Sequence, residues 1–503
     1  MKRPDAPQRG AKAAIGARLS AFAGPSERSL LLGTVLLVSA VSAVTGFVLA
    51  QYSSVDAISS LIFIPDDCSG DWGMNVGRHC FSDYPMTVNY GMRPNPWEPY
   101  PVHTQSGWKT AYNNYPAAGI LPQMLFGVLG KWLGAARLGL FGYLLALTIA
   151  ALSPAVWAAR GARGVERVVV FVACGIAAIP AWMAIDRGNP VALLAPVALV
   201  FLVALSRRRW GLVTIMVILA ALVKPQFALL AVALFAARQW RWGGIAVAGA
   251  VLSNIGAYLL WPRDFPGTIT QSLHNVLGFG SFHALVVHFN VSFAKGLLMI
   301  PDGIKARETG GTIPDGFLAG PRSLIGYGIV VLVVVGVLAL GRRIPPVMLG
   351  IVLLATAALF PALSLPYYLV FVLPIAALVV RDPDGPPGTG IFDRPAVLGG
   401  RRRAVGVCVS LAAALCIAHI ALPGPPIHAD VAAQVQAGTT GIIDRAVVST
   451  TVFLAPLLWL ITCAAIFVSY ARRPAPSSQS DHESENDDVP TEFAEPQQVG
   501  PPG

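Results

Sequence analysis

Long apolar runs constrain this chain more than any other feature of its sequence. Windows of about nineteen residues find about ten runs that are apolar enough to cross a membrane. They lie near residues 29–50, 136–158, 167–184, 190–206, 243–260, 324–341, 346–360, 367–380, 404–421 and 448–470. With 55% hydrophobic and only 12% charged residues, the composition does not fit a soluble core. We therefore expect an all-α membrane protein with about ten spans.

Basic residues between these runs set the expected orientation. They cluster on alternate connections, which is the pattern of cytoplasmic loops. The clusters are Arg160, Arg163 and Arg167, then Arg207 to Arg209, Arg238 and Arg241, Arg342 and Arg343, and Arg401 to Arg403. Ten spans then place both termini in the cytoplasm of a plasma-membrane protein. The formal net charge of +10 indicates contact with anionic lipid headgroups rather than with nucleic acid.

The two ends of the chain differ from the part between them. Residues 1–28 are basic, and we expect a cytoplasmic N-terminus there. No small-residue cleavage site follows the first apolar run, so we interpret that run as a helix and not as a signal peptide. Residues 29–470 form one transmembrane domain. The tail 471–503 is acidic and rich in Ser, Pro and Gln, which predicts a disordered cytoplasmic segment.

Two apolar stretches are too short for a regular span. Residues 116–133 fit an interfacial or re-entrant helix. Residues 211–237 contain about a dozen apolar residues on either side of Lys224-Pro225-Gln226, and neither half crosses about 30 Å of hydrocarbon as a regular helix. One interpretation is a broken hairpin with both ends cytoplasmic and Lys224 deep in the protein. The other is a pair of short packed spans that places Lys224 in the outer cavity.

Two polar segments are predicted to be structured outer loops. The first, residues 51–135, begins with a stretch rich in Asp, Asn, Tyr and Trp, whose irregular backbone cannot face lipid. Cys68 and Cys80 bracket a Gly-rich span in it and predict a disulfide on an oxidising face. The other four cysteines lie in apolar runs and are interpreted as small apolar side chains: Cys174, Cys408, Cys416 and Cys463. The second outer loop covers residues 262–323.

Asp83 is the leading candidate for a catalytic group. An Asp-rich outer loop over a helical bundle with isolated cations suggests a polar substrate that meets a lipid-linked phosphate. In such a sugar transfer one carboxylate accepts the proton of the acceptor hydroxyl, and cations stabilise the leaving phosphate. Asp83 suits the first role, although an Asp at this position also fits a helix cap. Asp66 and Asp67 are the alternative, in a Pro-Asp-Asp context that also fits a turn.

Lys224 and Arg187 are the main candidates for binding the donor phosphate. A lysine inside the membrane is costly and therefore indicates function, unless the boundary is misplaced and the side chain snorkels. Arg187 could clamp a phosphate with two hydrogen bonds or pair with Asp186 in a tight turn. Weaker phosphate candidates are Arg263, His274 and His288. Candidate substrate contacts are Tyr84, Asn114, Tyr367 and Tyr368, of which the last two also fit an interfacial aromatic belt.

Neither a metal site nor a nucleotide site is indicated by a motif. The histidines form no spaced metal pair, and Asp66, Asp67 and Asp71 would hold a divalent ion only weakly. A divalent metal therefore stays open as a cofactor. The chain has no Gly-rich phosphate loop with its lysine, which disfavours a nucleotide-sugar donor and favours a lipid-linked one.

Several short motifs resemble one family of membrane enzymes. They are Arg187-Gly-Asn-Pro-Val-Ala-Leu-Leu, Arg208-Arg-Trp-Gly-Leu, Leu222-Val-Lys-Pro-Gln, Ala237-Arg-Gln-Trp-Arg241, Tyr112-Asn-Asn-Tyr-Pro116 and Phe360-Pro-Ala-Leu-Ser-Leu-Pro-Tyr-Tyr-Leu-Val-Phe-Val-Leu-Pro374. Together they resemble the multispanning GT-C glycosyltransferases of actinobacterial cell envelopes, over roughly residues 30–380. Within that class the chain is similar to the arabinofuranosyltransferases that branch arabinan and to the polyprenyl-phosphate-mannose-dependent mannosyltransferases.

The resemblance implies a GT-C fold, a polyprenyl-phosphate sugar donor and an acidic catalytic residue early in the first outer loop. Ser82-Asp83 is the apparent match, displaced along the loop by the cysteine-bracketed insertion, and Asp66 and Asp67 remain the alternative. The expected activity is transfer of a sugar, arabinofuranose before mannose, to an envelope glycan or glycolipid outside the cell. The rival hypotheses are a transporter or flippase for a polyprenyl-linked sugar or lipid, and a non-catalytic scaffold for envelope assembly.

Overall fold

The fold is described from a computed structural model over residues 26–53, 61–62, 79–104, 107–278, 290–308, 321–398, 400, 402–423 and 447–472. Within these ranges almost all regular structure is helical. Strands occur there in two antiparallel hairpins, β1 (Tyr100–Thr104) with β2 (Gly107–Ala111) and β3 (Ala421–Pro423) with β4 (Val447–Ser449). The expected class, an all-α membrane protein, fits the described part of the chain.

Helices form over every predicted apolar run. The uninterrupted ones are α2 (Glu27–Ser53), α6 (Ala136–Ala159), α12 (Trp240–Ala257), α16 (Pro321–Leu340), α17 (Pro346–Leu359), α20 (Arg403–Ile417) and α21 (Thr450–Ala471). The composite ones are α7 (Val165–Phe171) with η2 (Val172–Ile176) and α8 (Ile179–Arg187), η3 (Pro190–Leu193) with α9 (Leu194–Ser206), and η8 (Pro366–Phe371) with α18 (Val372–Val380). Five helices are long and apolar enough to cross a membrane, or six if the bent α7–α8 pair is one span.

Two helical segments of the bundle are broken. In the first, the segment Val165–Ile176 and α8 meet at 47°, directly after the π-helical turn η2. The second break separates α10 (Trp210–Val223) from η4 (Pro225–Ala231) and α11 (Val232–Ala236). Lys224 is extended at this point, with φ −150° and ψ 118°, because the residue before a proline is pushed out of the helical region. The interruption predicted at Lys224-Pro225 is therefore present.

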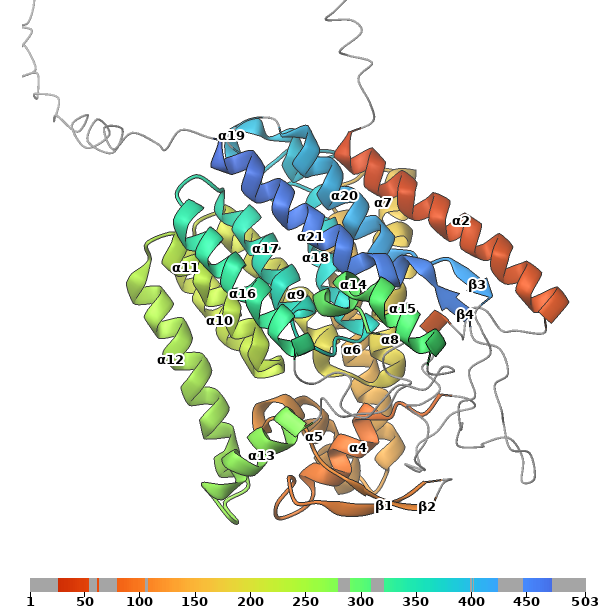
Figure 1. Ribbon diagram of the computed structural model, residues 1–503, viewed down its shortest axis with the longest axis vertical. Helices are drawn as coiled ribbons and strands as arrows, with labels where there is room; N and C mark the ends of the chain where they lie inside the picture. The colour runs from red at the N-terminus through yellow and green to blue at the C-terminus, as the bar shows by residue number, and fades with distance from the viewer. Residues whose placement is uncertain are drawn as a thin grey trace, which may run out of the picture.

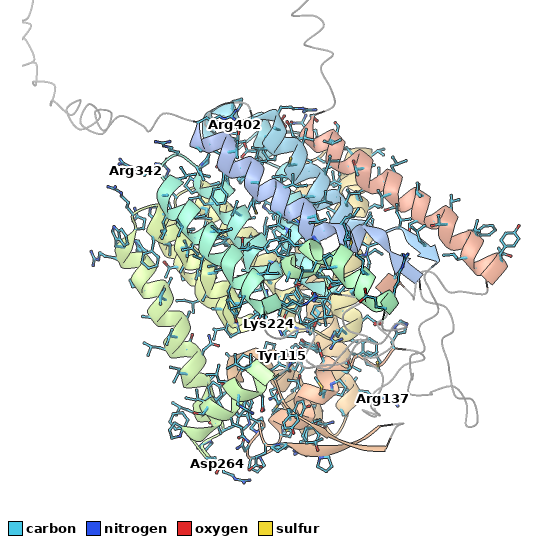
Figure 2. The ribbon with its side chains drawn as sticks, in the orientation of Figure 1. Tyr115, Arg137, Lys224, Asp264, Arg342 and Arg402 are labelled. Carbon is cyan, nitrogen blue, oxygen red and sulfur yellow. The ribbon has the colours of Figure 1, made fainter. Side chains whose placement is uncertain are left out.

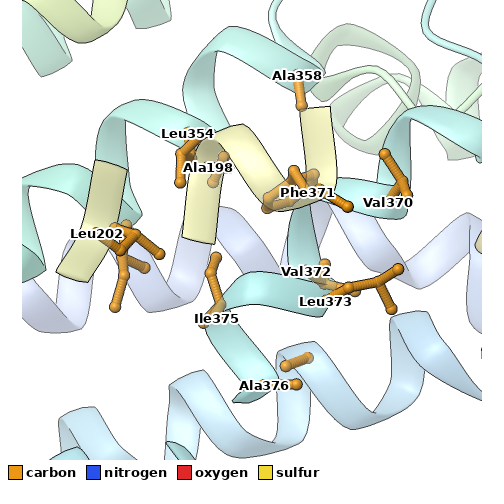
Figure 3. Packing of buried hydrophobic residues seen from close by; sticks show 14 of the residues in the cluster. Ala198, Leu202, Leu354, Ala358, Val370, Phe371, Val372, Leu373, Ile375 and Ala376 are labelled. Carbon is orange, nitrogen blue, oxygen red and sulfur yellow. The ribbon is translucent and has the colours of Figure 1, made fainter. Parts of the chain in front are cut away.

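The core lies where α9, α17 and α18 pack together. Every residue of α17 after Pro346 and every residue of α18 is buried, and almost all are apolar, as expected for a helix that is hydrophobic on all sides. Figure 3 shows Leu354 and Ala358 near Ala198, Phe371 and Ile375 at this junction. The outlying helices α2, α12 and α16 expose large apolar side chains instead, with Leu332 on α16 73% exposed. Such exposure is consistent with a surface that faces lipid.

Shorter elements form a separate layer at one end of the bundle (Figure 1). They are α4 (Asp83–Gly91), the β1–β2 hairpin, α5 (Ala117–Trp132) and α13 (Gly267–Gly278), all from the two predicted outer loops. Trp97 joins these loops, because its ring contacts Tyr258 at 4.8 Å and its carbonyl oxygen accepts a hydrogen bond from Asn275. The remaining helices of the second predicted loop are α14 (Phe293–Leu297) and α15 (Met299–Glu308).

The opposite end of the bundle is held by ion pairs around the connection between α18 and α20. This connection contains η9 (Ile391–Asp393) and α19 (Pro395–Leu398). Asp382 is buried and pairs with Arg394, while Arg28 of α2 donates a hydrogen bond to the carbonyl oxygen of Gly388. These contacts tie the first helix to a loop some 360 residues later in the chain.

The cysteines in apolar runs are free, as their interpretation required. Cys174, Cys416 and Cys463 are buried and Cys408 is half-buried. Cys80 is buried as well, but Cys68 lies outside the described residues. The Cys68–Cys80 disulfide therefore stays a prediction.

Candidate functional site

Asp83 lies in the first turn of α4 and is only 1% exposed. Its carboxylate does not cap that helix. Instead, Oδ2 accepts hydrogen bonds from the Tyr115 hydroxyl at 3.0 Å, from Arg187 Nε at 2.9 Å and from Asn189 Nδ2. Three donors from two distant segments thus converge on one carboxylate oxygen.

The turn after α8 presents Arg187 and Asn189 to this carboxylate. Gly188 ends the helix in the left-handed conformation, with φ 69°, which glycine adopts without a steric penalty. Asn189 then accepts a hydrogen bond from Val191 N and so caps η3, leaving its amide nitrogen to donate to Asp83. Asp186, the alternative partner predicted for Arg187, forms an ion pair with His79.

Tyr115 completes the group from the segment that leads into α5. Its backbone nitrogen donates to Asn113 and its carbonyl oxygen accepts from Trp97 Nε1, each at 2.9 Å, so the ring position is fixed from both sides. Burial, and next the Asp83 carboxylate, raise the pKa of Tyr115 well above its usual value. The hydroxyl is therefore neutral at physiological pH and donates to Asp83 while it accepts from Asn189 at 3.0 Å.

The Lys224 ammonium lies over the Tyr115 ring. Its Nζ atom is 4.0 Å from the ring centroid, and Figure 2 shows the two residues together between the bundle and the layer below it. The same Nζ is 5.7 Å from the ring centroid of Tyr368. The two interpretations of residues 211–237 differ in how the segment lies relative to the membrane, and both stay predictions. The backbone of Lys224 is hydrogen-bonded to Ala220 and Phe227, but its ammonium forms no hydrogen bond or ion pair with the described residues.

Tyr367 and Tyr368 lie near the start of η8, and their rings are close to Arg187 and Lys224, respectively. Their rings are 5.2 Å apart, and the guanidinium carbon of Arg187 is 5.3 Å from the Tyr367 ring centroid. Tyr367 is buried and Tyr368 half-buried, and each ring lies beside one of the two cations. A Lys or Arg over an aromatic face gains about 0.5–2 kcal/mol, depending on how far it is desolvated.

One atom at the centre of this site lacks a partner. Asp83 Oδ1 is buried and forms no hydrogen bond within the described part of the chain, although Oδ2 accepts three. An unpaired buried polar group costs about 1–3 kcal/mol. Oδ1 is therefore the oxygen that can accept a proton or a hydrogen bond from a bound molecule.

The other predicted site residues lie elsewhere. Arg263 is 53% exposed and pairs with Glu98 at 2.8 Å, and His274 is exposed on α13. Tyr84 packs against Tyr143 with ring centroids 5.1 Å apart. Asn114 is half-buried and has no printed contact with the Asp83 group. Asp66, Asp67 and His288 lie outside the described residues.

Tyr115 and Asn189 are the functional candidates that the sequence argument missed. Each stands beside a residue that was selected, Asn114 in Tyr112-Asn-Asn-Tyr-Pro116 and Arg187 in Arg187-Gly-Asn-Pro. The signal was present in those motifs, but only the folded chain shows which member faces the carboxylate. The described residues contain no group of three or more His, Cys, Asp or Glu side chains that could hold a metal ion.

We compared the chain with protein families, curated proteins and solved structures. No protein-family model, curated protein or solved structure matches the chain.

Proposed function

We propose that this protein is a membrane glycosyltransferase that moves a sugar from a polyprenyl phosphate to a cell-envelope glycan or glycolipid. Arabinofuranose is the favoured sugar and mannose the next. The observation that carries the proposal is the buried Asp83 carboxylate, whose Oδ2 has three donors and whose Oδ1 has none among the described residues. Lys224 provides a cation near it. A base and an electrophilic clamp are the two parts that such a transfer requires.

In this mechanism Asp83 Oδ1 accepts the proton of the acceptor hydroxyl. The hydroxyl oxygen forms a bond to the anomeric carbon, and the bond from that carbon to the phosphate oxygen breaks with its electron pair going to the phosphate. Tyr115, Arg187 and Asn189 hold the carboxylate in place through Oδ2. Lys224 stabilises the charge on the departing phosphate, which is the developing charge at such a centre.

The finer topology belongs to the same proposal. We count the shorter apolar helices, which are 10–17 residues long, as membrane crossings together with the long ones. This gives about ten crossings in a GT-C-like bundle. Both termini are then cytoplasmic, and the layer of α4, α5, β1–β2 and α13 faces outward in the plasma membrane. The Asp83 site lies between that layer and the bundle, where a lipid-linked donor and an envelope glycan or glycolipid acceptor can meet.

The test is sugar transfer by purified protein in lipid, with radiolabelled synthetic polyprenyl-phosphoryl arabinose and, separately, mannose. Product from one donor is expected and would settle both class and sugar. Asp83→Asn should reduce transfer by about 10²–10⁴-fold, the usual contribution of a general base. The matched control is Asp382→Asn, which alters a buried Asp–Arg pair at the opposite end of the bundle. Wild-type transfer by Asp83→Asn would remove Asp83 from the mechanism.

One observation supports a transporter as the second candidate. Lys224 stands at a helix break, and α7–α8 contains another break of 47°. Broken helices that meet near a binding site are common in secondary transporters. Absence of transfer from either donor, in protein shown to be folded, together with flipping of a polyprenyl-linked sugar in liposomes, would favour this alternative.

A further inference from the structure

Six buried polar atoms that have no hydrogen-bond partner among the described residues gather where α4, α5 and α6 meet. They are Asp83 Oδ1, Tyr84 OH, Thr87 Oγ1, Gln123 Nε2, Gln123 Oε1 and Tyr143 OH. Their five side chains are at most 1% exposed. Buried polar groups in proteins are nearly always hydrogen-bonded, either to protein atoms or to ordered water. Molecules bound at this junction would supply the partners that these groups lack.

The helix geometry brings four of these side chains to one place. Asp83 and Thr87 are four residues apart on α4 and therefore share a face. The Tyr84 ring is stacked on Tyr143 of α6. The Tyr84 hydroxyl lies against Gly139 of the same helix, where an added Cβ would be 2.8 Å from it.

Gln123 enters the same junction from α5. One turn later on that helix, Gly127 packs so closely that an added Cβ would be 2.6 Å from the side chain of Val88, the residue after Thr87. Phe126, three residues after Gln123, contacts Tyr143 at a ring distance of 5.7 Å. The face of α5 that carries Gln123 thus packs between α4 and α6. Gln123 is fully buried there, with neither amide atom hydrogen-bonded in the described part.

We propose that Thr87, Gln123 and Tyr143 hold a chain of internal water molecules that carries the proton away from Asp83 Oδ1. Water is the occupant that fits, because these three side chains are at most 1% exposed and each of them can both donate and accept. The inference rests on the proposed function for the origin of the proton. The acceptor hydroxyl gives its proton to Oδ1, and Oδ1 passes it to the adjacent water, which restores the carboxylate for the next turnover.

The α4 face also provides an exit. Oδ2 is closed by its three donors, so the proton leaves from Oδ1 past Thr87. Tyr90 follows three residues later, and its ring contacts Tyr100 at 4.8 Å. The half-buried guanidinium of Arg93 lies 3.8 Å from the Tyr100 ring centroid, so this row of residues ends at the surface. The water chain connects the buried carboxylate with that end of α4.

The first test compares turnover in a relay variant and a control. The relay variant, Gln123→Leu with Tyr143→Phe, removes three of the unpaired atoms and replaces each side chain with an apolar one of similar size. We expect kcat for sugar transfer to fall about tenfold or more while KM for the donor stays unchanged, together with a larger solvent deuterium isotope effect. Tyr470→Phe is the control, because it removes a buried hydroxyl that donates to Leu398 O at 3.0 Å. A relay variant with wild-type kcat and isotope effect would overturn the proposal.

A second test does not depend on transferase activity. Infrared spectroscopy follows hydrogen–deuterium exchange of the Asp83 carboxyl in protein acidified until this group is protonated, with the band assigned by its loss in Asp83→Asn. We expect exchange to be about tenfold slower in the relay variant than in the wild type. Equal exchange rates would contradict the relay even if transfer is found. Slower exchange in a protein without transfer activity would retain the relay and refute only the glycosyltransferase.

Discussion

Asp83 and Arg187 form a buried ion pair between segments that are 104 residues apart, with Arg187 Nε 2.9 Å from Asp83 Oδ2. The pair joins the start of α4, which belongs to the first predicted outer loop, to the end of α8 in the bundle. Its side chains are 1% and 17% exposed. The site therefore exists only when the loop and the bundle are packed together.

The ion pair predicts a separation between stability and activity. Arg187→Met leaves an uncompensated buried carboxylate and should lower the free energy of unfolding by about 3–5 kcal/mol. The double variant Asp83→Leu with Arg187→Met removes both charges and should recover most of that loss, while transfer stays abolished. Unfolding in detergent, followed by tryptophan fluorescence, measures both variants. Equal stability of Arg187→Met and the wild type would show that the pair is not energetically coupled to the fold.

Lys224 should be a residue that costs stability for the sake of function. Its ammonium lies 4.0 Å from the Tyr115 ring centroid and 5.7 Å from that of Tyr368, and it forms no ion pair within hydrogen-bonding distance in the described part of the chain. Lys224→Met should leave thermal stability unchanged or raise it, since a desolvated charge is removed, and should weaken binding of the polyprenyl-phosphate donor. Lys131→Met, at an exposed position on α5, is the matched control. Unchanged donor affinity in Lys224→Met would exclude the phosphate role.

Apolar runs and composition predicted the helices well but the site only in part. Every apolar run became a helix, because a long apolar run between polar segments leaves the chain few alternatives. The break at Lys224 was also predictable, since Pro225 excludes helical geometry at the residue before it. These are local constraints, and they can be read from neighbouring residues alone.

The contacts of the site could not be predicted in the same way. Tyr115 and Asn189 lie 32 and 106 residues from Asp83, and nothing local distinguishes Tyr115 from Asn114 as its partner. Arg263 was selected for its charge, but Glu98 lies next to it and neutralises it. Which polar residue faces a carboxylate is decided by how the outer layer packs on the bundle, and that packing depends on contacts between distant segments.

Tyr115 has two separable roles. Tyr115→Phe removes the hydroxyl that donates to Asp83 but keeps the ring beneath Lys224, whereas Tyr115→Leu removes both. We expect Phe to impair kcat while preserving donor affinity, and Leu to impair both. The loss of a hydrogen bond to a charged group corresponds to about 1.5–3 kcal/mol. Steady-state transfer kinetics and donor binding distinguish the variants. Identical behaviour of the Phe and Leu variants would remove the separate role of the ring.

Gly188 tests whether the turn after α8 positions the carboxylate. Its φ of 69° is unfavourable for any residue with a Cβ, and an added Cβ would lie 3.1 Å from Phe81 O and 3.3 Å from Tyr84 N. Gly188→Ala should therefore lower stability by about 1–2 kcal/mol and impair transfer, because the backbone on both sides of Asp83 must shift. Gly256→Ala is the control, since an added Cβ there meets nothing within 4 Å and its helical backbone should gain about 0.5–1 kcal/mol. Equal stability and activity of these two variants would show that the turn tolerates displacement, and Arg187 and Asn189 would then owe their positions to α8 and η3 alone.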